Sequence, residues 1–386
     1  MQSGDVNKKL GFGLMRLPII DERDRSTVDV DQLCDMVDLY LSRGFSYFDT
    51  AHRYNDFASE PAIRKALVER YDRSAYRLAD KVTINFIKSE ADLEPFFDKQ
   101  LAACGVDYFD NYLVHNMGSS KYAQAQECRT FEFISRLKDT GKVKHIGFSF
   151  HDSPEVLAGI LKDHPEVEYV QLQLNYLDWD DPVIRSRECY EVARAFDKRV
   201  LVMEPIKGGT LINVPADVKD MLLAADQNAS LASWALRFVA GLDGVEMVLS
   251  GMSTLAQIDD NTTSMTDFDP LNETEKSLLN KAVLMIRASA AIPCTGCGYC
   301  APVCKKDIPI PDVFSVYNNK MRLKNDGYFS NQVNYYMNIT KDRGKASECL
   351  HCGKCEKECP QHLSIREYME ICAESFEGRV DGHRPL

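Results

Sequence analysis

Residues 45–81 read FSYFDTAHRYNDFASEPAIRKALVERYDRSAYRLADK and contain one complete structural unit. The aromatic run FSYFD is followed by a polar loop, by the amphipathic segment EPAIRKALVER and by a second apolar run, YRLADK. A short strand, a loop and a helix that lead into another strand are typical of sheets whose strands are parallel. This stretch therefore predicts an α/β fold.

The same unit recurs along the chain before residue 270. Eight strands, each followed by a helical stretch such as RECYEVARAFDKR, are what a (β/α)8 TIM barrel requires. A doubly wound open sheet is the alternative, but it usually places a G-x-G-x-x-G loop after its first strand, and that motif does not occur in the sequence. The pattern favours a barrel, with strands at GFGLMR (11–16), FSYFD (45–49), YRLADK (76–81), YFDNYLVH (108–115), VKHIGFS (143–149), EYVQLQL (168–174), RVLVMEP (199–205) and VEMVLSG (245–251).

Eight of the 13 cysteines lie in two identical patterns. CTGCGYCAPVC (294–304) and CLHCGKCEKEC (349–359) both have the spacing C-x2-C-x2-C-x3-C of bacterial ferredoxins, in which the fourth cysteine ligates the other cluster. Zinc is the alternative, although a zinc site needs only four ligands from two C-x2-C pairs. The spacing predicts two [4Fe–4S] clusters, one held by Cys294, Cys297, Cys300 and Cys359, the other by Cys349, Cys352, Cys355 and Cys304.

The segments around these motifs predict a small, mainly α-helical, ferredoxin-like domain. Aromatic and aliphatic residues recur at helical intervals in IPDVFSVYNNKMRLKND (310–326), in YFSNQVNYYMNI (328–339) and in LSIREYMEICAESF (363–376). We therefore expect the barrel at residues 1–270, a helical linker at 271–289, and the iron–sulfur domain with a C-terminal tail at 290–386.

Length and charge are consistent with this division. A chain of 386 residues exceeds what one hydrophobic core usually organises. The net charge of −12 comes from the first part, because 46 acidic and 33 basic residues precede Cys294, whereas 12 acidic and 13 basic residues follow from it. An acidic field repels nucleic acid and anionic membranes. With no long apolar run and no apolar segment behind the basic residues of the N-terminus, we expect a soluble, cytoplasmic protein without nucleic-acid or membrane partners.

Polar residues at the predicted strand ends form a set that suits carbonyl reduction. The active site of such a barrel lies where its strands end. We expect Asp49, Lys81 and His115 to end their strands, with Tyr54 in the loop after the first of them. A phenol has a pKa of about 10, but a neighbouring ammonium favours its phenolate, and a carboxylate keeps that ammonium charged and positioned. His115 then orients the carbonyl or relays the proton.

The segment FDTAHRYN, the lysine of LADKV and the histidine of YLVHN resemble the Asp–Tyr–Lys–His tetrad of the aldo/keto reductases. The likeness runs from about Leu10 to Asn261. It implies a (β/α)8 barrel that binds extended NADPH or NADH without a Rossmann motif. It also implies that the catalytic residues are Asp49, Tyr54, Lys81 and His115.

The resemblance extends to cofactor-binding residues. It implies that Ser149 and Gln171 bind the nicotinamide carboxamide, and that Pro205 and Gly208 lie near the middle of the cofactor. In the segment SGMSTLAQIDDN, Ser250, Gly251, Gln257 and Asn261 are expected at the adenosine end. Many relatives carry Lys and Arg where this chain has Gly251 and Gln257, and these provide the best donors for the 2′-phosphate of NADP. NADH therefore remains an alternative to NADPH.

The predicted function is NAD(P)H-dependent reduction of a small-molecule aldehyde or ketone, or oxidation of the corresponding alcohol. A nicotinamide exchanges a hydride whereas iron–sulfur clusters pass single electrons, and no flavin-binding signature occurs that would couple the two. The clusters are then structural, or they exchange electrons with a redox-protein partner, or they serve a reaction unusual for the family. The alternative function is redox sensing or electron transfer, with the barrel as a nucleotide-binding module.

Overall fold

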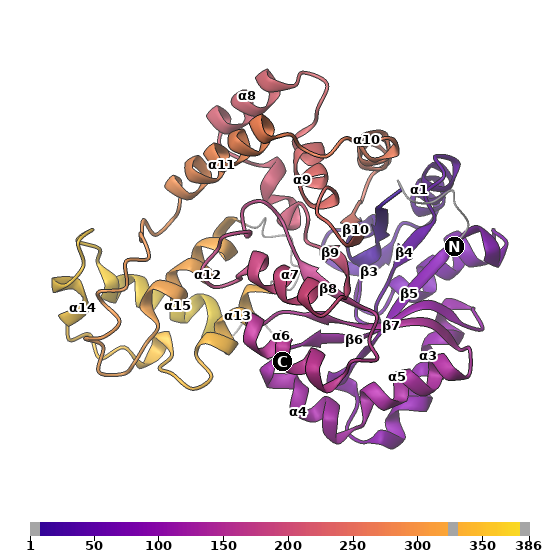
Figure 1. Ribbon diagram of the computed structural model, residues 1–386, viewed down its shortest axis with the longest axis horizontal. Helices are drawn as coiled ribbons and strands as arrows, with labels where there is room; N and C mark the ends of the chain where they lie inside the picture. Colours follow the sequence, from indigo (N-terminus) through magenta and orange to yellow (C-terminus); the bar gives the residue numbers. More distant parts are fainter. Residues whose placement is uncertain (1–7, 323–330, 379–386) are drawn as a thin grey trace.

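A computed structural model describes residues 8–322 and 331–378 of the chain. Figure 1 shows a large α/β body, coloured indigo to magenta and orange, and a smaller lobe of helices, coloured orange to yellow, at its side. We call residues 290–322 and 331–378 the small lobe. Residues 1–7, 323–330 and 379–386 lie outside the described residues. The end of the predicted helix at 310–326 and the predicted C-terminal tail fall in these ranges.

The large body is a closed barrel of eight parallel strands, which confirms the predicted TIM barrel. The strands lie around the barrel in the order β1, β10, β9, β8, β7, β6, β5, β4. A short antiparallel hairpin precedes the first helix and was not predicted. The strands are β1 (Leu10–Gly13), β4 (Tyr47–Asp49), β5 (Arg77–Thr83), β6 (Phe109–Met117), β7 (Val143–Phe150), β8 (Tyr169–Gln173), β9 (Arg199–Met203) and β10 (Val245–Gly251), and the hairpin consists of β2 (Ile19–Asp21) and β3 (Asp24–Val28).

Two predicted strand ends are wrong in a way that matters for the site. Lys81 and His115 were expected to end their strands, but β5 continues to Thr83 and β6 to Met117. The reason is pairing with neighbouring strands: β5 stays paired with β6 as far as Thr83 and His115, and β6 continues by pairing Met117 with Phe150 of β7. Both side chains therefore start inside the barrel wall rather than at its rim.

Helices surround the barrel, and their ends carry ordinary signals. Asp29 caps α1 by accepting a hydrogen bond from the backbone of Gln32, and Ser153 caps α6 in the same way ahead of Pro154. The helices of the large body are α1 (Val30–Ser42), α2 (Ser59–Ile63), α3 (Leu93–Cys104), α4 (Ser119–Glu127), α5 (Thr130–Asp139), α6 (Pro154–Asp163), α7 (Ser186–Ala195), α8 (Ala216–Ala225), α9 (Leu231–Ala240), α10 (Leu255–Thr266) and α11 (Glu273–Ala288).

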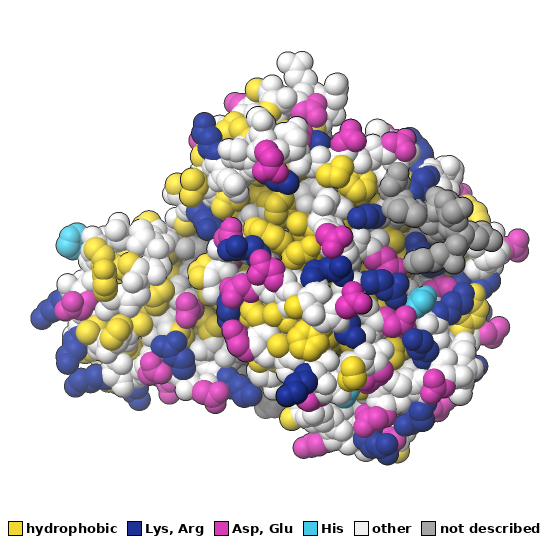
Figure 2. All heavy atoms as spheres, viewed as in Figure 1, with side chains coloured by type: hydrophobic (Ala, Val, Ile, Leu, Met, Phe, Trp, Pro, Cys, Tyr) yellow, Lys and Arg dark blue, Asp and Glu magenta, His cyan; other side chains and the backbone are white. Residues whose placement is uncertain are grey.

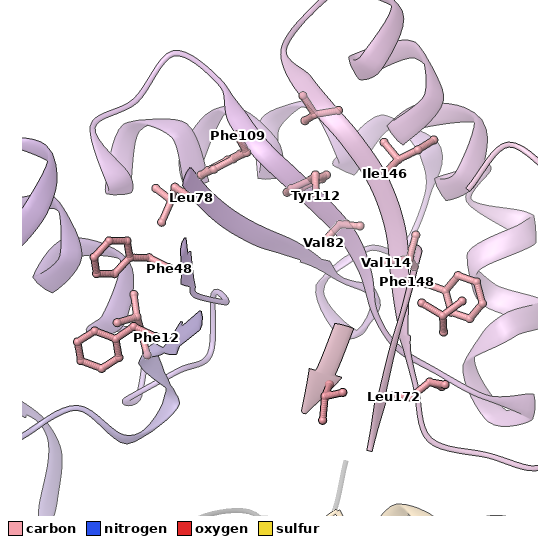
Figure 3. Close-up of a cluster of buried hydrophobic side chains, with 14 of the residues drawn as sticks. Phe12, Phe48, Leu78, Val82, Phe109, Tyr112, Val114, Ile146, Phe148 and Leu172 are labelled. Atoms are coloured by element: carbon pink, nitrogen blue, oxygen red, sulfur yellow. The ribbon is translucent and has the colours of Figure 1, made fainter. Parts of the chain in front are cut away.

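The main core lies between the strands and these helices. Figure 3 shows Phe12, Phe48, Leu78 and Tyr112 extending from the strands into it, and each is fully buried. A second, smaller set of side chains fills the inside of the barrel: Tyr47, Ala79, Leu113, Tyr169, Leu201, Met247 and Leu249. The interior is thus packed, and the barrel is a rigid support for residues at its open end.

A substitution at Gly147 in β7 tests how closely the barrel strands are packed. A Cβ at Gly147 would lie 2.3 Å from the carbonyl oxygen of Tyr169 and 2.7 Å from its ring, and the backbone atom cannot move aside. We expect Gly147→Ala to lower the free energy of unfolding of the barrel by about 1–3 kcal/mol or more. Gly159→Ala in α6 is the control, because nothing lies within 4 Å of its added methyl group. It should raise that free energy by about 0.5–1 kcal/mol in urea titrations.

The small lobe is helical, as predicted. It contains α12 (Ile310–Arg322), α13 (Gln332–Ile339), α14 (Lys354–Lys357) and α15 (Ile365–Glu377). Its own hydrophobic core includes Phe314, Tyr336 and Phe376, and the rings of Tyr336 and Phe376 are stacked 4.5 Å apart. The residues predicted as a linker form α11, which packs against α8.

The small lobe is docked on the barrel next to the ends of β7 and β8. Ile184 of the large body belongs to the hydrophobic core of the small lobe. The carboxylate of Asp181 accepts hydrogen bonds from Ser315 Oγ at 3.3 Å and from Asn319 Nδ2 at 3.1 Å, both on α12. Asn338 Nδ2 on α13 donates to the carbonyl oxygen of His151 at 3.0 Å. Apolar and polar contacts together hold the lobe in one position.

Charged side chains of both signs are spread over the face of the molecule that Figure 2 shows. Figure 2 shows Lys and Arg interspersed with Asp and Glu over the large body, with smaller groups of hydrophobic side chains between them. In residues 8–322 and 331–378 there is no helix with the length and apolar character that spanning a membrane requires.

Candidate functional site

A cavity of about 580 Å³ opens where the barrel strands end. Its wall includes the last residues of β1, β4, β9 and β10, together with the loops that follow them. Most of the residues predicted from the sequence to bind cofactor or to act in catalysis line it: Asp49, Tyr54, Gln171, Pro205, Gly208, Ser250, Gly251, Gln257 and Asn261. Lys81, His115 and Ser149 are not in the cavity wall, but they adjoin Asp49, Tyr54 and Gln171, which are.

Lys81 and Asp49 form a buried ion pair at the base of the cavity. Lys81 Nζ lies 2.6 Å from Asp49 Oδ1 and donates a second hydrogen bond to the carbonyl oxygen of Thr50 at 2.7 Å. Burial lowers the pKa of Lys81, but Asp49 and Tyr54 outweigh it and hold the pKa above its usual value. The ammonium is therefore charged and fixed in place at neutral pH.

Tyr54 lies against this ammonium. Lys81 Nζ is 4.8 Å from the centre of the Tyr54 ring. Burial raises the pKa of the phenol, and the charge of Lys81 opposes that rise. The hydroxyl consequently remains protonated at neutral pH, while the nearby positive charge stabilises the phenolate that would form when the proton leaves.

His115 faces Tyr54 from β6. The two rings are nearly perpendicular, with centroids 6.1 Å apart, and His115 Nδ1 lies 3.3 Å from Thr83 Oγ1. Burial, followed by the charges of Lys81 and Lys121, lowers the pKa of His115 well below its usual value. A neutral imidazole beside the phenol can donate a hydrogen bond to a carbonyl oxygen without competing for its proton.

An unusual loop conformation presents Tyr54. The three residues after it, Asn55, Asp56 and Phe57, all have left-handed backbone angles, with φ of 49°, 49° and 72°. Such angles are unfavourable for residues other than glycine and persist only when the surroundings enforce them. Asn55 is fully buried, and its Nδ2 donates to the carbonyl oxygen of Arg25 at 3.3 Å. The sequence predicted a loop at this position but not its left-handed backbone conformation.

A buried polar network behind Lys81 was also missed. Gln100 Nε2 donates to the carbonyl oxygen of Lys81 at 3.2 Å and to Glu60 Oε1 at 3.0 Å, and His52 Nδ1 lies 3.1 Å from Glu60 Oε2. All three side chains are buried. The sequence indicated only an amphipathic segment here, with no role for Glu60. The network fixes the backbone that carries Lys81.

The residues predicted to bind nicotinamide have hydrogen-bonding capacity to spare. Ser149 and Gln171 are paired in register across β7 and β8. Ser149 Oγ accepts a hydrogen bond from the backbone N–H of Asn116 at 2.7 Å and retains its own proton to donate. Gln171 Oε1 is buried and has no hydrogen-bond partner among the described residues. An unpartnered buried acceptor next to a donor fits the carboxamide group of a nicotinamide.

The cavity wall also includes a backbone turn with two glycines and two basic side chains. Gly208 and Gly209 have φ of 58° and 91°, which only glycine adopts without strain. Arg16 and Lys219 line the cavity as well, and sequence reasoning missed both. A Cβ at Gly251 would lie 3.6 Å from the Cβ of Arg16, so the arginine from the β1 end occupies the space beside this glycine.

The eight clustered cysteines line two small cavities in the small lobe. Cys294, Cys297, Cys300 and Cys359 surround one, and Cys304, Cys349, Cys352 and Cys355 surround the other. Each cavity thus receives three cysteines from one motif and the last cysteine from the other, which fits the ligand sets of two cubane clusters. Across the described ranges, no three His, Cys, Asp or Glu side chains converge on a point that would suit a single metal ion.

Paired serine substitutions test the crossed ligand sets. With two [4Fe–4S] clusters the protein holds about eight irons. If ligands cross between motifs, Cys294→Ser with Cys359→Ser removes ligands of one cluster, and about four irons should remain by colorimetric iron determination. Cys349→Ser with Cys359→Ser should affect both clusters and leave almost none. The opposite result for the two pairs would show uncrossed ligands, and Cys372→Ser, a buried cysteine outside both motifs, is the control.

The family model described as the aldo/keto reductase family matches residues 9–283. The chain belongs to the aldo/keto reductase family. A model for a 4Fe–4S dicluster domain matches residues 293–363 of this aldo/keto reductase, which supports iron–sulfur clusters in the small lobe. The family resemblance predicted from the tetrad is therefore confirmed, together with the additional domain.

Individual relatives of this aldo/keto reductase are distant. The probable aldo-keto reductase 1 of Glycine max is 28% identical over 178 residues, which cover 43% of this chain and 47% of the relative. An aldo-keto reductase of Mycolicibacterium smegmatis is 25% identical over 219 residues, covering 56% of this chain and 70% of the relative. The chain spans about half the length of the curated relatives from Equus caballus and Glycine max that it matches.

Solved structures share the barrel fold. The holo form of an aldo-keto reductase from Bacillus halodurans has a TM-score of 0.58 and 24% identity, covering 71% of this chain and 91% of that chain. An aldo-keto reductase from Klebsiella pneumoniae in complex with NADPH also has a TM-score of 0.58, with 19% identity and coverage of 71% and 90%. At these identities the likeness establishes the fold alone.

Proposed function

We propose that the barrel reduces the carbonyl group of a small aldehyde or ketone with NADPH or NADH, and oxidises the corresponding alcohol in the reverse direction. The observation that carries the proposal is the buried Lys81 ammonium, held 2.6 Å from Asp49 Oδ1 and 4.8 Å from the ring of Tyr54 at a cavity of about 580 Å³. Buried charged groups of this kind are concentrated at functional sites, where they adjust the pKa of a reacting group.

In the proposed reaction Tyr54 is the proton donor. A nicotinamide held by Ser149 and Gln171 would supply the hydride for the carbonyl carbon. The hydroxyl of Tyr54 transfers its proton to the carbonyl oxygen, and Lys81 stabilises the phenolate left behind. Asp49 keeps Lys81 charged and oriented, while the neutral ring of His115 donates a hydrogen bond to the carbonyl oxygen and so aligns it. The products are an alcohol and the oxidised cofactor.

The cavity supports NADPH at least as well as NADH. Gln171 and Ser149 suit the carboxamide, and we propose that the Gly208–Gly209 turn lies along the middle of the cofactor. Arg16 and Lys219 supply positive charge at the cavity wall where Gly251 and Gln257 supply none. The Klebsiella pneumoniae structure, which shares the fold, contains NADPH, so NADPH is one of the two cofactors to be tested.

Replacement of Arg16 tests that assignment. Arg16→Gln removes a charge-assisted hydrogen bond of roughly 1.5–3 kcal/mol, so the Kd for NADPH should rise about 10-fold or more. The measurement is quenching of protein fluorescence on titration with each cofactor. If Arg16 binds the 2′-phosphate, NADH affinity should change little. Equal NADPH affinity in both proteins would contradict the assignment.

The proposed activity is tested with the holoprotein and a panel of aldehydes and ketones. Oxidation of NADPH or NADH is followed at 340 nm. Turnover of at least one carbonyl compound is expected. Cofactor binding without turnover of any member of the panel would contradict carbonyl reduction.

Redox sensing or electron transfer is the second candidate. The observation in its favour is that Cys297 and Cys352, one in each cysteine set, are exposed, which would bring the edge of each cluster near solvent. Its discriminating result would be reversible cluster reduction by dithionite that is unchanged in Tyr54→Phe, together with no carbonyl reduction. A redox-protein partner belongs to this candidate.

We also propose the division into a barrel at 1–270, a linking helix at 271–289 and an iron–sulfur domain at 290–386. The family matches at 9–283 and 293–363 support a barrel followed by an iron–sulfur domain, and the first match includes most of the linking helix. The packing of α11 against α8 suggests that the linking helix folds with the barrel. A cytoplasmic location remains a proposal of the same kind.

A further inference from the structure

Two basic side chains beside the Tyr54–His115 pair have no part in the proposed proton transfer. Arg53 directly precedes Tyr54 in the loop after β4 and is exposed. Lys121 is half-buried in the first turn of α4, which begins just after β6, the strand that carries His115. Because β4 and β6 flank β5, the two residues stand on either side of the strand that bears Lys81.

The charges of these residues act on the same small region. Burial is the main reason why the pKa of His115 is low, and Lys121 and Arg53 lower it further. Burial and the charge of Arg53 also lower the pKa of Lys121 to about 8. Burial lowers the pKa of His151, and the charge of Lys121 lowers it further. Since β4, β5 and β6 lie side by side and the rings of Tyr54 and His115 are 6.1 Å apart, the loop that carries Arg53 and the start of the helix that carries Lys121 lie at the same edge of the site.

Among the described residues, no carboxylate lies within ion-pair distance of Arg53 or Lys121. Asp152 is the acidic residue beside the start of α4, but its Oδ2 accepts the backbone N–H of Ser119 at 2.7 Å and its Oδ1 accepts that of Ser153 at 2.7 Å. Within residues 8–322 and 331–378, the side chains of Arg53 and Lys121 take part in no ion pair. A partly buried ammonium without a counter-ion is costly, and a bound anion would relieve that cost.

The small lobe encloses the same region. The backbone N–H of His151 donates to the carbonyl oxygen of Met117 at 3.0 Å, which joins the ends of β7 and β6. On the other side of His151, Asn338 donates to its carbonyl oxygen, and the ring of Tyr335 packs edge-on at 6.1 Å. Helix α13 therefore covers His151 at the end of β7.

We propose that the substrate is an anionic carbonyl compound whose carboxylate or phosphate group is bound by Arg53 and Lys121 while its carbonyl group meets Tyr54 and His115. This inference rests on the proposed carbonyl reduction. The guanidinium of Arg53 presents paired donors that match either oxyanion, and Lys121 adds a point charge. Substrates of this class include oxo acids and phosphorylated aldehydes.

The kinetic test compares matched anionic and neutral substrates. The ratio of kcat/KM is measured for succinic semialdehyde against butyraldehyde, and for glyceraldehyde 3-phosphate against glyceraldehyde. Wild-type holoprotein should prefer the anionic member of at least one pair, which also identifies the anion as carboxylate or phosphate. In Arg53→Gln/Lys121→Gln that ratio should fall roughly 10- to 100-fold, the loss expected for charge-assisted hydrogen bonds.

The control is Lys99→Gln, an exposed lysine of α3 that has no ion pair in the part of the chain that the structure describes; the ratio should match that of the wild type. A wild-type protein without preference for either anionic substrate, or a double variant with an unchanged ratio, would overturn the proposal.

A binding test separates this inference from the proposed reaction. Calorimetry measures the Kd of succinate and of inorganic phosphate for the holoprotein in the presence of oxidised cofactor. At least one anion should bind, with an affinity that falls at least 10-fold in Arg53→Gln/Lys121→Gln. If that result appears although no carbonyl is reduced, the proposed function fails and the anion site stands. Absent binding, or equal binding to wild type and double variant, removes the anion site whatever the turnover.

Discussion

Tyr54→Phe is expected to lower kcat for carbonyl reduction by about 10²- to 10⁴-fold, the usual contribution of a positioned proton donor. The phenyl ring retains the contact with Lys81 Nζ at 4.8 Å, so that packing around the ammonium is largely preserved. Only the transferable proton is lost. Steady-state kinetics with the best substrate of the panel, at saturating cofactor, provide the measurement.

The matched control for Tyr54→Phe is Tyr190→Phe on the outer helix α7. Its hydroxyl donates a hydrogen bond to the carbonyl oxygen of Asp243 at 2.7 Å, far along the chain from the tetrad. The control variant should retain the kcat of the wild type. Cofactor affinity should be the same in all three proteins, because Tyr54 acts on the carbonyl oxygen. A kcat for Tyr54→Phe within about 3-fold of the wild type would exclude Tyr54 as the proton donor.

Lys81→Met is expected to have the largest effect on stability. The side chains of Lys81 and Asp49 are 0% and 3% exposed, so removing the ammonium leaves a buried carboxylate without its partner. Breaking such a pair costs about 3–5 kcal/mol of the free energy of unfolding. The activity should also fall by two orders of magnitude or more, since the phenolate of Tyr54 loses its stabilising charge.

The second substitution that separates these effects is Asp49→Asn. In Lys81→Met/Asp49→Asn the uncompensated charge is gone, so urea denaturation followed by circular dichroism should show that much of the lost stability returns. Catalysis should not return, because no ammonium faces Tyr54. Recovery of both properties, or of neither, would contradict the separate roles assigned to Lys81. Lys65→Met, an exposed lysine after α2, should change the unfolding free energy by less than about 0.5 kcal/mol.

The barrel was predictable from sequence because its strands are short apolar runs that alternate with amphipathic helices. VEMVLSG was predicted at 245–251 and forms β10 over the same residues. YRLADK was placed correctly but ended too early, because polar Thr83 continues the strand through pairing with His115. Where a parallel strand ends depends on the neighbour that it pairs with, and local composition does not contain that information.

The site was predictable where its residues lie near strand ends, as Asp49 and Tyr54 do. It was not predictable where contacts join distant segments. Arg16 reaches the wall of the cavity beside Gly251, from the opposite end of the barrel sequence. From the sequence, only Gly251 and Gln257 were compared with the Lys and Arg of many family members. From that comparison, basic residues for the 2′-phosphate of NADP were not expected at these two positions. The left-handed loop at Asn55–Phe57 was hidden for a related reason, since the buried amide of Asn55 is bonded to Arg25.

The cysteine motifs behave differently, since their spacing alone implies which ligands belong together. The two cavities in the small lobe have the same crossed membership. What the spacing could not indicate was the position of the lobe. Its docking depends on Asp181 of the barrel, which accepts from Ser315 and Asn319, and on Asn338, which donates to the carbonyl oxygen of His151.

The central claim is that the barrel transfers a hydride from a nicotinamide to a carbonyl carbon with Tyr54 as the proton donor. Its most direct test is a single turnover with NADPH deuterated at C4 and the best carbonyl substrate, followed by mass spectrometry of the alcohol. Preparations deuterated on either face of the ring should be compared. We expect one deuterium on the carbinol carbon from one of the two preparations, at a rate reduced at least about 100-fold in Tyr54→Phe. An alcohol without deuterium from either preparation would contradict the account.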